Sequence, residues 1–119
     1  MRMTEVAFGV QPPVDAYGPG GFRIGGAWRD GAVLLSPEGF TPLDHPSDGI
    51  AQLAGIEADA VDLVIVGQGP EIAPLPRDWR LALEQAGHGV EHMATPAACR
   101  TYNVLLAESR RVAALLIPM

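Results

Sequence analysis

The chain has 119 residues, of which 48% are hydrophobic and 18% are charged, so disorder through low hydrophobicity is excluded and a buried core can form. This length suits one domain, and we expect a single domain over residues 1–119. The 14 acidic and 8 basic residues give a formal net charge of −6, which opposes binding to nucleic acid. All the basic residues are arginines, so chemistry that needs a lysine Schiff base or a P-loop lysine is excluded.

Cysteine content and hydropathy indicate the compartment. Cys99 is the only cysteine, so no disulfide can form within the chain, which is typical of a reducing compartment. The first residues lack the long apolar stretch of a signal peptide, and no run approaches the roughly 18 apolar residues of a membrane span. We therefore expect a cytoplasmic protein that does not span a membrane.

The first half of the chain predicts short elements separated by turns. We expect a strand over residues 6–10, a loop over 11–21 that carries Tyr17, and an antiparallel hairpin whose strands, 22–28 and 32–35, flank Asp30-Gly31. A turn over 36–39 and an irregular segment to about residue 46 follow. The next predicted element is a short helix over 48–54, with Ser47 as its N-cap and Gly55 at its end.

The second half predicts longer elements that alternate between strand and helix. An apolar run over 61–66 is typical of a strand buried on both faces, and a helix capped by Asp78 and stopped by Gly87 follows it. We then expect a strand over 90–93, a helix over 96–109 that begins after Thr95, and a strand over 112–117. This order predicts a compact α/β domain with a mixed β-sheet, in which an N-terminal antiparallel hairpin joins a C-terminal β-α-β-α-β segment.

A glycine-rich turn is the first candidate for ligand binding. Gly67, Gln68 and Gly69 follow the buried strand, at the edge where ligands often bind in open α/β sheets, and their backbone amides could hold an anion. Pro70 removes one donor, and a simple tight turn explains the same pattern. We therefore take these three residues as candidates for the rim of a pocket.

Polar side chains on the helix over 96–109 are the second candidate. Arg100, Tyr102 and Asn103 interrupt an otherwise apolar helix, so some of them must meet partners inside the protein or at an interface. One interpretation places them in a pocket between the glycine turn and the start of this helix, where Arg100 would hold an anionic group that Tyr102 and Asn103 orient. In the other, Tyr102 fills the core while Arg100 and Asn103 fix a neighbouring loop.

Other reactive residues form no recognisable catalytic or metal-binding pattern. His88 and His92 are four positions apart, but glycines flank His88 and the segment predicts a turn followed by a strand, so we expect no shared metal ion. Cys99 near a helix N-terminus could be an activated nucleophile, or it could pack as a small buried residue. No nucleophile elbow is present, and we expect no catalytic residues.

Exposed arginine and aromatic residues are candidates for a partner surface. Arg23, Trp28 and Arg29 fall in the predicted hairpin, and both residue types are enriched at protein interfaces. A solvated hairpin face is the alternative interpretation of these three residues.

The run from Met93 to Ala114 resembles the C-terminal hallmark of a small protein family. Three further pieces agree in order, and the resemblance covers nearly the whole chain: Tyr17-Gly18 with Gly21-Phe22, the run Val33 to Pro37, and the run Val64 to Gly69. The family includes a mitochondrial assembly factor of respiratory complex I, a human adipogenesis-associated protein, and many small bacterial and archaeal proteins of unassigned function.

The resemblance implies a compact α/β fold, no established catalytic activity and no known cofactor. For the mitochondrial branch it implies a role in assembling complex I together with another assembly factor at the inner membrane. We therefore expect a protein-interaction domain without chemistry of its own. We expect its partners to be proteins, with respiratory complex I subunits or assembly factors as candidates. A peripheral association with the membrane is compatible with this role. The alternative is a binder of a small anionic metabolite, or an uncharacterised enzyme, with the pocket described above.

Overall fold

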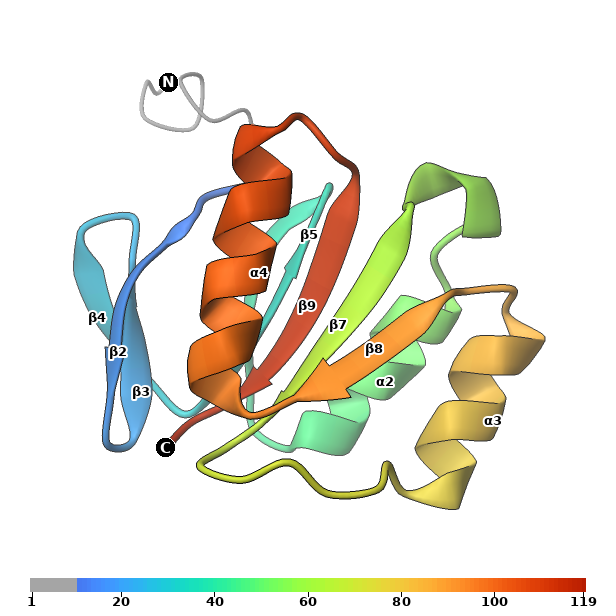
Figure 1. Cartoon of the computed structure of the whole chain (residues 1–119), viewed down its shortest axis with the longest axis horizontal. Coiled ribbons are helices and arrows are strands. Elements are labelled where there is room, and N and C mark those ends of the chain that lie inside the picture. The colour runs from blue at the N-terminus through green and yellow to red at the C-terminus, as the bar shows by residue number, and fades with distance from the viewer. Residues whose placement is uncertain (1–10) are drawn as a thin grey trace.

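The structure is a computed structural model that describes residues 11–119. In this range, eight strands form two sheets, and three α-helices pack against the larger sheet (Figure 1). The smaller sheet is antiparallel and consists of β2 (Val14–Gly18), β3 (Gly21–Ile24) and β4 (Ala27–Asp30). The compact α/β class predicted from the sequence is therefore confirmed.

The larger sheet has five strands in the order β6-β5-β9-β7-β8. They are β5 (Ala32–Ser36), β6 (Gly39–Leu43), β7 (Leu63–Gln68), β8 (Val90–Met93) and β9 (Val112–Ile117). β9 pairs with β5 antiparallel and with β7 parallel, and β7 pairs with β8 parallel. The mixed sheet and its C-terminal β-α-β-α-β segment are thus as predicted, and β8 has the predicted bounds.

Helices cover both faces of the larger sheet (Figure 1). α2 (Pro46–Ala54) and α3 (Arg77–Gln85) lie on one face, while α4 (Thr95–Ala107) and the smaller sheet lie on the other, and a 3-10 turn, η1 (Ala58–Ala60), precedes β7. Side chains of β9 alternate between the two resulting cores: Val112, Ala114 and Leu116 face α4, whereas Ala113 and Leu115 face α2. Because both faces are covered, the strand reads as a continuous apolar run.

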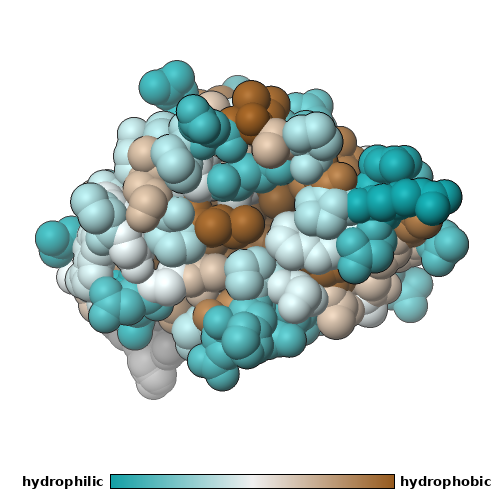
Figure 2. Space-filling view, turned by 90° about the horizontal axis from the view of Figure 1, so that it is seen from below, coloured by the Kyte–Doolittle hydropathy of each residue, from teal (hydrophilic) through white to brown (hydrophobic). Residues whose placement is uncertain are grey.

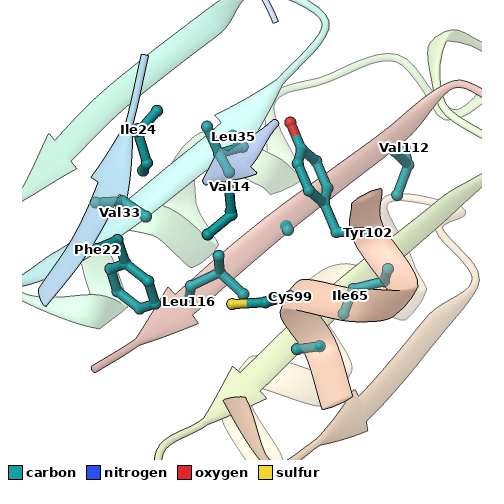
Figure 3. Close-up of a cluster of buried hydrophobic side chains, with 12 residues drawn as sticks. Val14, Phe22, Ile24, Val33, Leu35, Ile65, Cys99, Tyr102, Val112 and Leu116 are labelled. Atoms are coloured by element: carbon teal, nitrogen blue, oxygen red, sulfur yellow. The ribbon is translucent and has the colours of Figure 1, made fainter. Parts of the chain in front are cut away.

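The core between α4 and the two sheets contains the largest buried side chain, Tyr102 (Figure 3). Its ring lies among side chains from the smaller sheet and from β5, including Val14 and Leu35, and Cys99 lies one helical turn away (Figure 3). The helix α4 therefore both supplies the buried Tyr102 and attaches the smaller sheet.

The structure corrects three N-terminal predictions. The loop expected over residues 11–21 contains the strand β2, and the segment expected to be irregular contains β6. The antiparallel hairpin exists, but it turns at Gly25-Gly26, whose φ angles of 62° and 82° suit a two-residue turn. Gly31, with φ 86°, instead carries the chain from one sheet to the other. The strand predicted over residues 6–10 lies outside the described residues.

The predicted N-terminal helix caps are also wrong, although the helices are present and Gly55 is the C-cap of α2 as predicted. α2 begins at Pro46 after His45, α3 begins at Arg77 after Pro76, and α4 begins at Thr95 after Ala94, and none of these positions has a side-chain cap. Ser47 and Asp78 therefore lie inside the first turns of their helices. Proline at the first or second position of α2 and α4 lacks the amide hydrogen that would otherwise need a partner.

Candidate functional site

The glycine turn and the start of α4 are in direct contact, and Thr95 joins them. The Gly69 amide donates a hydrogen bond to Thr95 Oγ1 (2.8 Å), and the Thr95 amide donates to the Gly69 carbonyl (2.8 Å). The Thr95 hydroxyl in turn donates to the Ile117 carbonyl (2.5 Å), so one buried side chain links β7, α4 and β9. Sequence reasoning placed Thr95 as a helix cap and missed this contact with the glycine turn.

Gly67 lies where α4 packs closely against β7. A Cβ atom at this position would be 3.0 Å from both the Ala98 Cβ and a Leu116 methyl group, and 3.1 Å from Thr95 Oγ1. The contact between the turn and α4 is thus filled by protein atoms. Cys99 lies in the same packed interface, where burial raises the pKa of its thiol to about 11. The thiol is therefore protonated at neutral pH, which supports the packing interpretation of Cys99.

Gln68 organises the segment that follows the turn. Its Nε2 donates to the Ala73 carbonyl (2.7 Å), and its Oε1 accepts from the Ala73 amide (3.2 Å). The same Oε1 lies 3.0 Å from His92 Nδ1 on β8, a pairing that requires the hydrogen on Nδ1. Gln68 therefore holds the exposed segment 70–76 against β8.

The polar residues of α4 divide between the interior and the surface. The Tyr102 hydroxyl donates to the Pro12 carbonyl (2.6 Å), and burial raises the pKa of Tyr102 above its ordinary value. Asn103 binds the backbone of Val14 with both ends of its carboxamide. Arg100 is exposed. Tyr102 thus fills the core and binds the segment before β2, and Asn103 fixes β2, which agrees with the second interpretation for these two residues but does not extend to Arg100.

A groove of about 270 Å³ lies between β2 and the first turns of α4. Two of the predicted pocket residues, Arg100 and Asn103, line it together with Asp15, Tyr17 and Cys99. Gly67, Gln68, Gly69 and Tyr102 do not line this groove. The structure therefore brings Arg100 and Asn103 to one concave surface, which the glycine turn does not line.

A larger groove of about 580 Å³ lies between α3 and β8, and sequence reasoning missed it. Its walls include Pro74 and Leu75 from the segment held by Gln68, Arg80 and Glu84 from α3, and Val90 and His92 from β8. Arg80 and Glu84 form an exposed ion pair of 3.8 Å. The one sequence feature that could have indicated this groove is the four-residue spacing of His88 and His92, because both residues line it.

His88 is buried at the inner end of this groove. Its Nε2 lies 2.9 Å from the Leu53 carbonyl, so this nitrogen carries the hydrogen, and Nδ1 has no partner among the described residues. Residues 11–119 contain no group of three or more His, Cys, Asp or Glu side chains that could hold a metal ion together.

The predicted partner surface is divided by the pleat of the smaller sheet. Arg23 and Trp28 are direct cross-strand neighbours on the outer face, whereas Arg29 pairs with Phe22 on the inner face and lies 5.0 Å from the centre of the Phe40 ring. The Trp28 indole covers Gly18 and Gly21 and donates to Asp30 (2.9 Å). Trp28 is 44% exposed, and these contacts hold its ring in place on the outer face of the smaller sheet.

The end of the molecule where β7 and β9 finish carries exposed apolar groups. Figure 2 looks onto this end and shows apolar residues near the middle, with polar residues around them. Ile72 in the segment after β7 and Met119 after β9 are 61% and 39% exposed. No helix in the described part of the chain is long and apolar enough to cross a membrane.

Fold and site together define a compact α/β domain whose surface carries the two grooves described above. The chain belongs to the family described as protein of unknown function (DUF498/DUF598), whose model matches residues 14–117.

Three relatives illustrate the family. The chain is 44% identical to an uncharacterised protein of Rhodobacter capsulatus, over 100% of this chain and 94% of that protein. It is 31% identical to human NADH dehydrogenase (ubiquinone) 1 alpha subcomplex assembly factor 3, over 88% of this chain but only 60% of the human protein. A crystal structure described as an outer membrane protein of Bartonella henselae matches with a TM-score of 0.84 and 37% identity, over 92% of this chain and 96% of that one.

Proposed function

We propose that this domain is a non-catalytic protein-interaction domain that acts as an assembly factor for a respiratory NADH dehydrogenase complex. The observation that carries the proposal is the 31% identity to human assembly factor 3 along 88% of the chain. The position of the polar α4 residues supports it, because Tyr102 and Asn103 are committed to holding β2 and leave little side-chain chemistry for a reaction. The partners would be complex I subunits or other assembly factors, with contact at the membrane surface.

The partner surface that we propose is the outer face of the smaller sheet. Arg23 and Trp28 lie side by side there, and Trp28 is held flat by its contacts with Gly18 and Gly21. A rigid aromatic ring beside an arginine is typical of residues that carry much of the binding energy at interfaces. Arg29 would contribute indirectly, since it packs on Phe40 behind that face.

Co-purification tests this function. The protein would be tagged at its own chromosomal locus, extracted in mild detergent, and its partners identified by mass spectrometry. We expect NADH dehydrogenase subunits or assembly factors to be enriched, and Arg23→Glu to deplete them while Arg77→Ala, an exposed substitution on α3, does not. Replacing Arg23, Trp28 and Arg29 together by Ala extends the test. Recovery of the protein alone would contradict the assembly function, and full recovery by the triple variant would contradict the assigned surface.

We also propose a cytoplasmic location, supported by the free thiol of Cys99. Because one relative is described as an outer membrane protein, the inner and outer membrane fractions are the ones to compare with the cytoplasm. Cell fractionation should place the protein in the cytoplasm and on the cytoplasmic side of the inner membrane, and recovery from the outer membrane would contradict the proposal.

The groove between β2 and α4 favours a second candidate function, the binding of a small anionic metabolite. Arg100 and Asn103 line this groove, and Arg100 is exposed and able to pair with a carboxylate or phosphate. A thermal-shift screen of anionic metabolites tests it, because a ligand at 100 times its Kd adds about 2.7 kcal/mol of stability. Shifts that disappear in Arg100→Ala would support the candidate, and a panel without shifts would exclude the metabolites tested.

A further inference from the structure

The strand β8 is an open edge of the larger sheet within the described part of the chain. It pairs only with β7 there, and Figure 1 shows it as the outermost strand on the side of α3. The Val64 amide of β7 donates to the Gly89 carbonyl (2.9 Å), and Val64 is in register with Val90. Because neighbouring residues of a strand direct their backbone groups to opposite sides, Glu91 also faces β7. The amides and carbonyls of Val90 and His92 therefore point away from the sheet, where a further strand would pair.

The two faces of this edge differ in character. The side chains of Val90 and His92 are on the α3 side and line the 580 Å³ groove, whose lining also includes Pro74 and Leu75. Glu91 is in register with Ile65 on the α4 side, and it is exposed. None of the ion pairs among residues 11–119 includes Glu91. An added strand would thus meet a groove lined in part by Pro74, Leu75 and Val90 on one face, and the exposed Glu91 carboxylate on the other.

The groove is held in shape before any partner arrives. Gln68 binds Ala73 twice and also contacts His92, so the wall formed by Pro74 and Leu75 is tied to β8. Gly89, which begins the edge, has no atom within 4 Å of the position that a Cβ would take. Its φ is not in the left-handed region, so the backbone does not demand glycine, and no atom crowds the face of the sheet at this end of the strand.

We propose that β8 accepts an extended segment of a partner protein as an added strand, with an apolar side chain in the α3–β8 groove and a lysine or arginine beside Glu91. The proposal rests on the interaction function given above and names a second surface for it. Main-chain hydrogen bonds to Val90 and His92 supply affinity, and the alternating side chains supply selectivity.

Charge argues against a second copy of this chain as the occupant. Antiparallel pairing of two β8 edges through Val90 and His92 would place each Glu91 directly opposite the other, and like charges in that position are destabilising. The formal net charge of −6 adds to this repulsion. A basic, apolar segment from another protein has neither disadvantage.

The test uses the full chain and a labelled, capped synthetic peptide of alternating valine and lysine, with binding followed by fluorescence anisotropy and by NMR. We expect binding that protects the Val90 and His92 amides from exchange. A fully N-methylated version of the peptide keeps every charge but cannot pair as a strand, and it should not bind. A peptide of alternating valine and glutamate should bind more weakly than the lysine peptide.

A pair of matched variants separates edge docking from general attraction between a basic peptide and an acidic protein. Glu91→Lys should weaken the lysine peptide about fivefold, the upper range for a cross-strand charge pair, and strengthen the glutamate peptide. Glu38→Lys makes the same charge change at an exposed turn on the far side of the sheet, and it should leave both affinities nearly unchanged.

The outcomes are distinct. Equal effects of the two variants, binding of the N-methylated peptide, or protection elsewhere would overturn the proposal, and so would a concentration-dependent dimer that protects Val90 and His92 without peptide. If the peptide does not bind but partners are still recovered from cells, the proposal that β8 accepts a strand is rejected, and the proposed interaction function is unaffected. Peptide binding at the edge without any partner recovered from cells would reject the assembly function alone.

Discussion

Asn103 and Val14 are 89 positions apart, yet the Asn103 carboxamide pairs with the Val14 backbone as a neighbouring strand would. Asn103 Oδ1 accepts from the Val14 amide (2.9 Å), and Nδ2 donates to the Val14 carbonyl (2.8 Å). The edge of β2 is thereby satisfied by a helix instead of by another strand, and the smaller sheet is fixed to α4.

We predict that Asn103→Ala destabilises the domain by about 2–3 kcal/mol, because both the amide and the carbonyl of Val14 lose their partner in a partly buried place. Urea unfolding measures the loss, and the β2 amides should exchange faster. Arg100→Ala, an exposed change three positions away on the same helix, should cost less than about 0.5 kcal/mol. Similar losses of stability for the two variants would contradict the role of Asn103 in holding β2.

Thr95 offers a test of the junction between β7, α4 and β9. Thr95→Val keeps the shape but removes the hydroxyl that accepts from the Gly69 amide and donates to the Ile117 carbonyl, so we expect a loss of about 2–4 kcal/mol. Thr95→Ser keeps both hydrogen bonds and should recover most of that stability. The two thermal unfolding curves decide the matter, and a serine variant as unstable as the valine variant would show that packing of the methyl group dominates.

Ser109 holds an unfavourable backbone angle that a glycine would relieve. It has φ 63° directly after α4, where the Arg110 amide donates to the Leu105 carbonyl and the Ser109 amide donates to the Leu106 carbonyl. This is a Schellman motif, whose left-handed position favours glycine. We predict that Ser109→Gly stabilises the domain by about 1 kcal/mol, whereas Ser109→Ala gives no such gain. Chemical denaturation of the three proteins is the measurement.

Asp62 gives the stability a defined pH dependence. Hydrogen bonds from the Arg111 side chain (2.8 Å) and amide (3.0 Å) hold the pKa of the Asp62 carboxyl below its ordinary value. A carboxyl whose pKa is lower in the folded state contributes stability that is present above its unfolded pKa of about 3.9 and is lost as the pH falls through the folded pKa. Asp62→Asn should therefore be less stable than the parent at neutral pH, and the difference should shrink in acid. A constant difference at every pH would point to packing, and Glu38→Gln, an exposed change, serves as the control.

The sequence predicts the C-terminal half well because its elements follow from local pattern. β9 has the bounds that its apolar run indicates, since a strand covered on both faces carries its signal in every residue. α4 is likewise marked by its apolar stripe and by Pro96.

The N-terminal half could not be predicted in the same way, because distant residues form its strands. β2 lies in a segment rich in glycine and proline and becomes a strand through Asn103 and β3. β6 contains Pro42, which an edge strand tolerates where its nitrogen faces outward. Gly25-Gly26 and Asp30-Gly31 are equally good turn signals, and only the packing of Phe22 and Ile24 against β5 decides between them.

The candidate site could be predicted only in part for the same reason. The sequence indicated that Gly67 and Arg100 belong to neighbouring regions, which follows from strand and helix order. It gave no sign that Gln68 and His92 are partners, because their contact depends on how β7 and β8 are aligned. The groove between α3 and β8 left only the spacing of His88 and His92 as a local pattern, and that spacing does not indicate a groove.

The position of β9 has a consequence for biosynthesis. This strand lies between β5 and β7, yet it follows every other described strand along the chain. While the ribosome still holds residues 112–117, β5 with β6 and β7 with β8 remain two separate pairs that expose apolar surfaces. The nascent chain therefore cannot complete this sheet before β9 has left the ribosome, and until then its exposed apolar surfaces are open to chaperones and proteases.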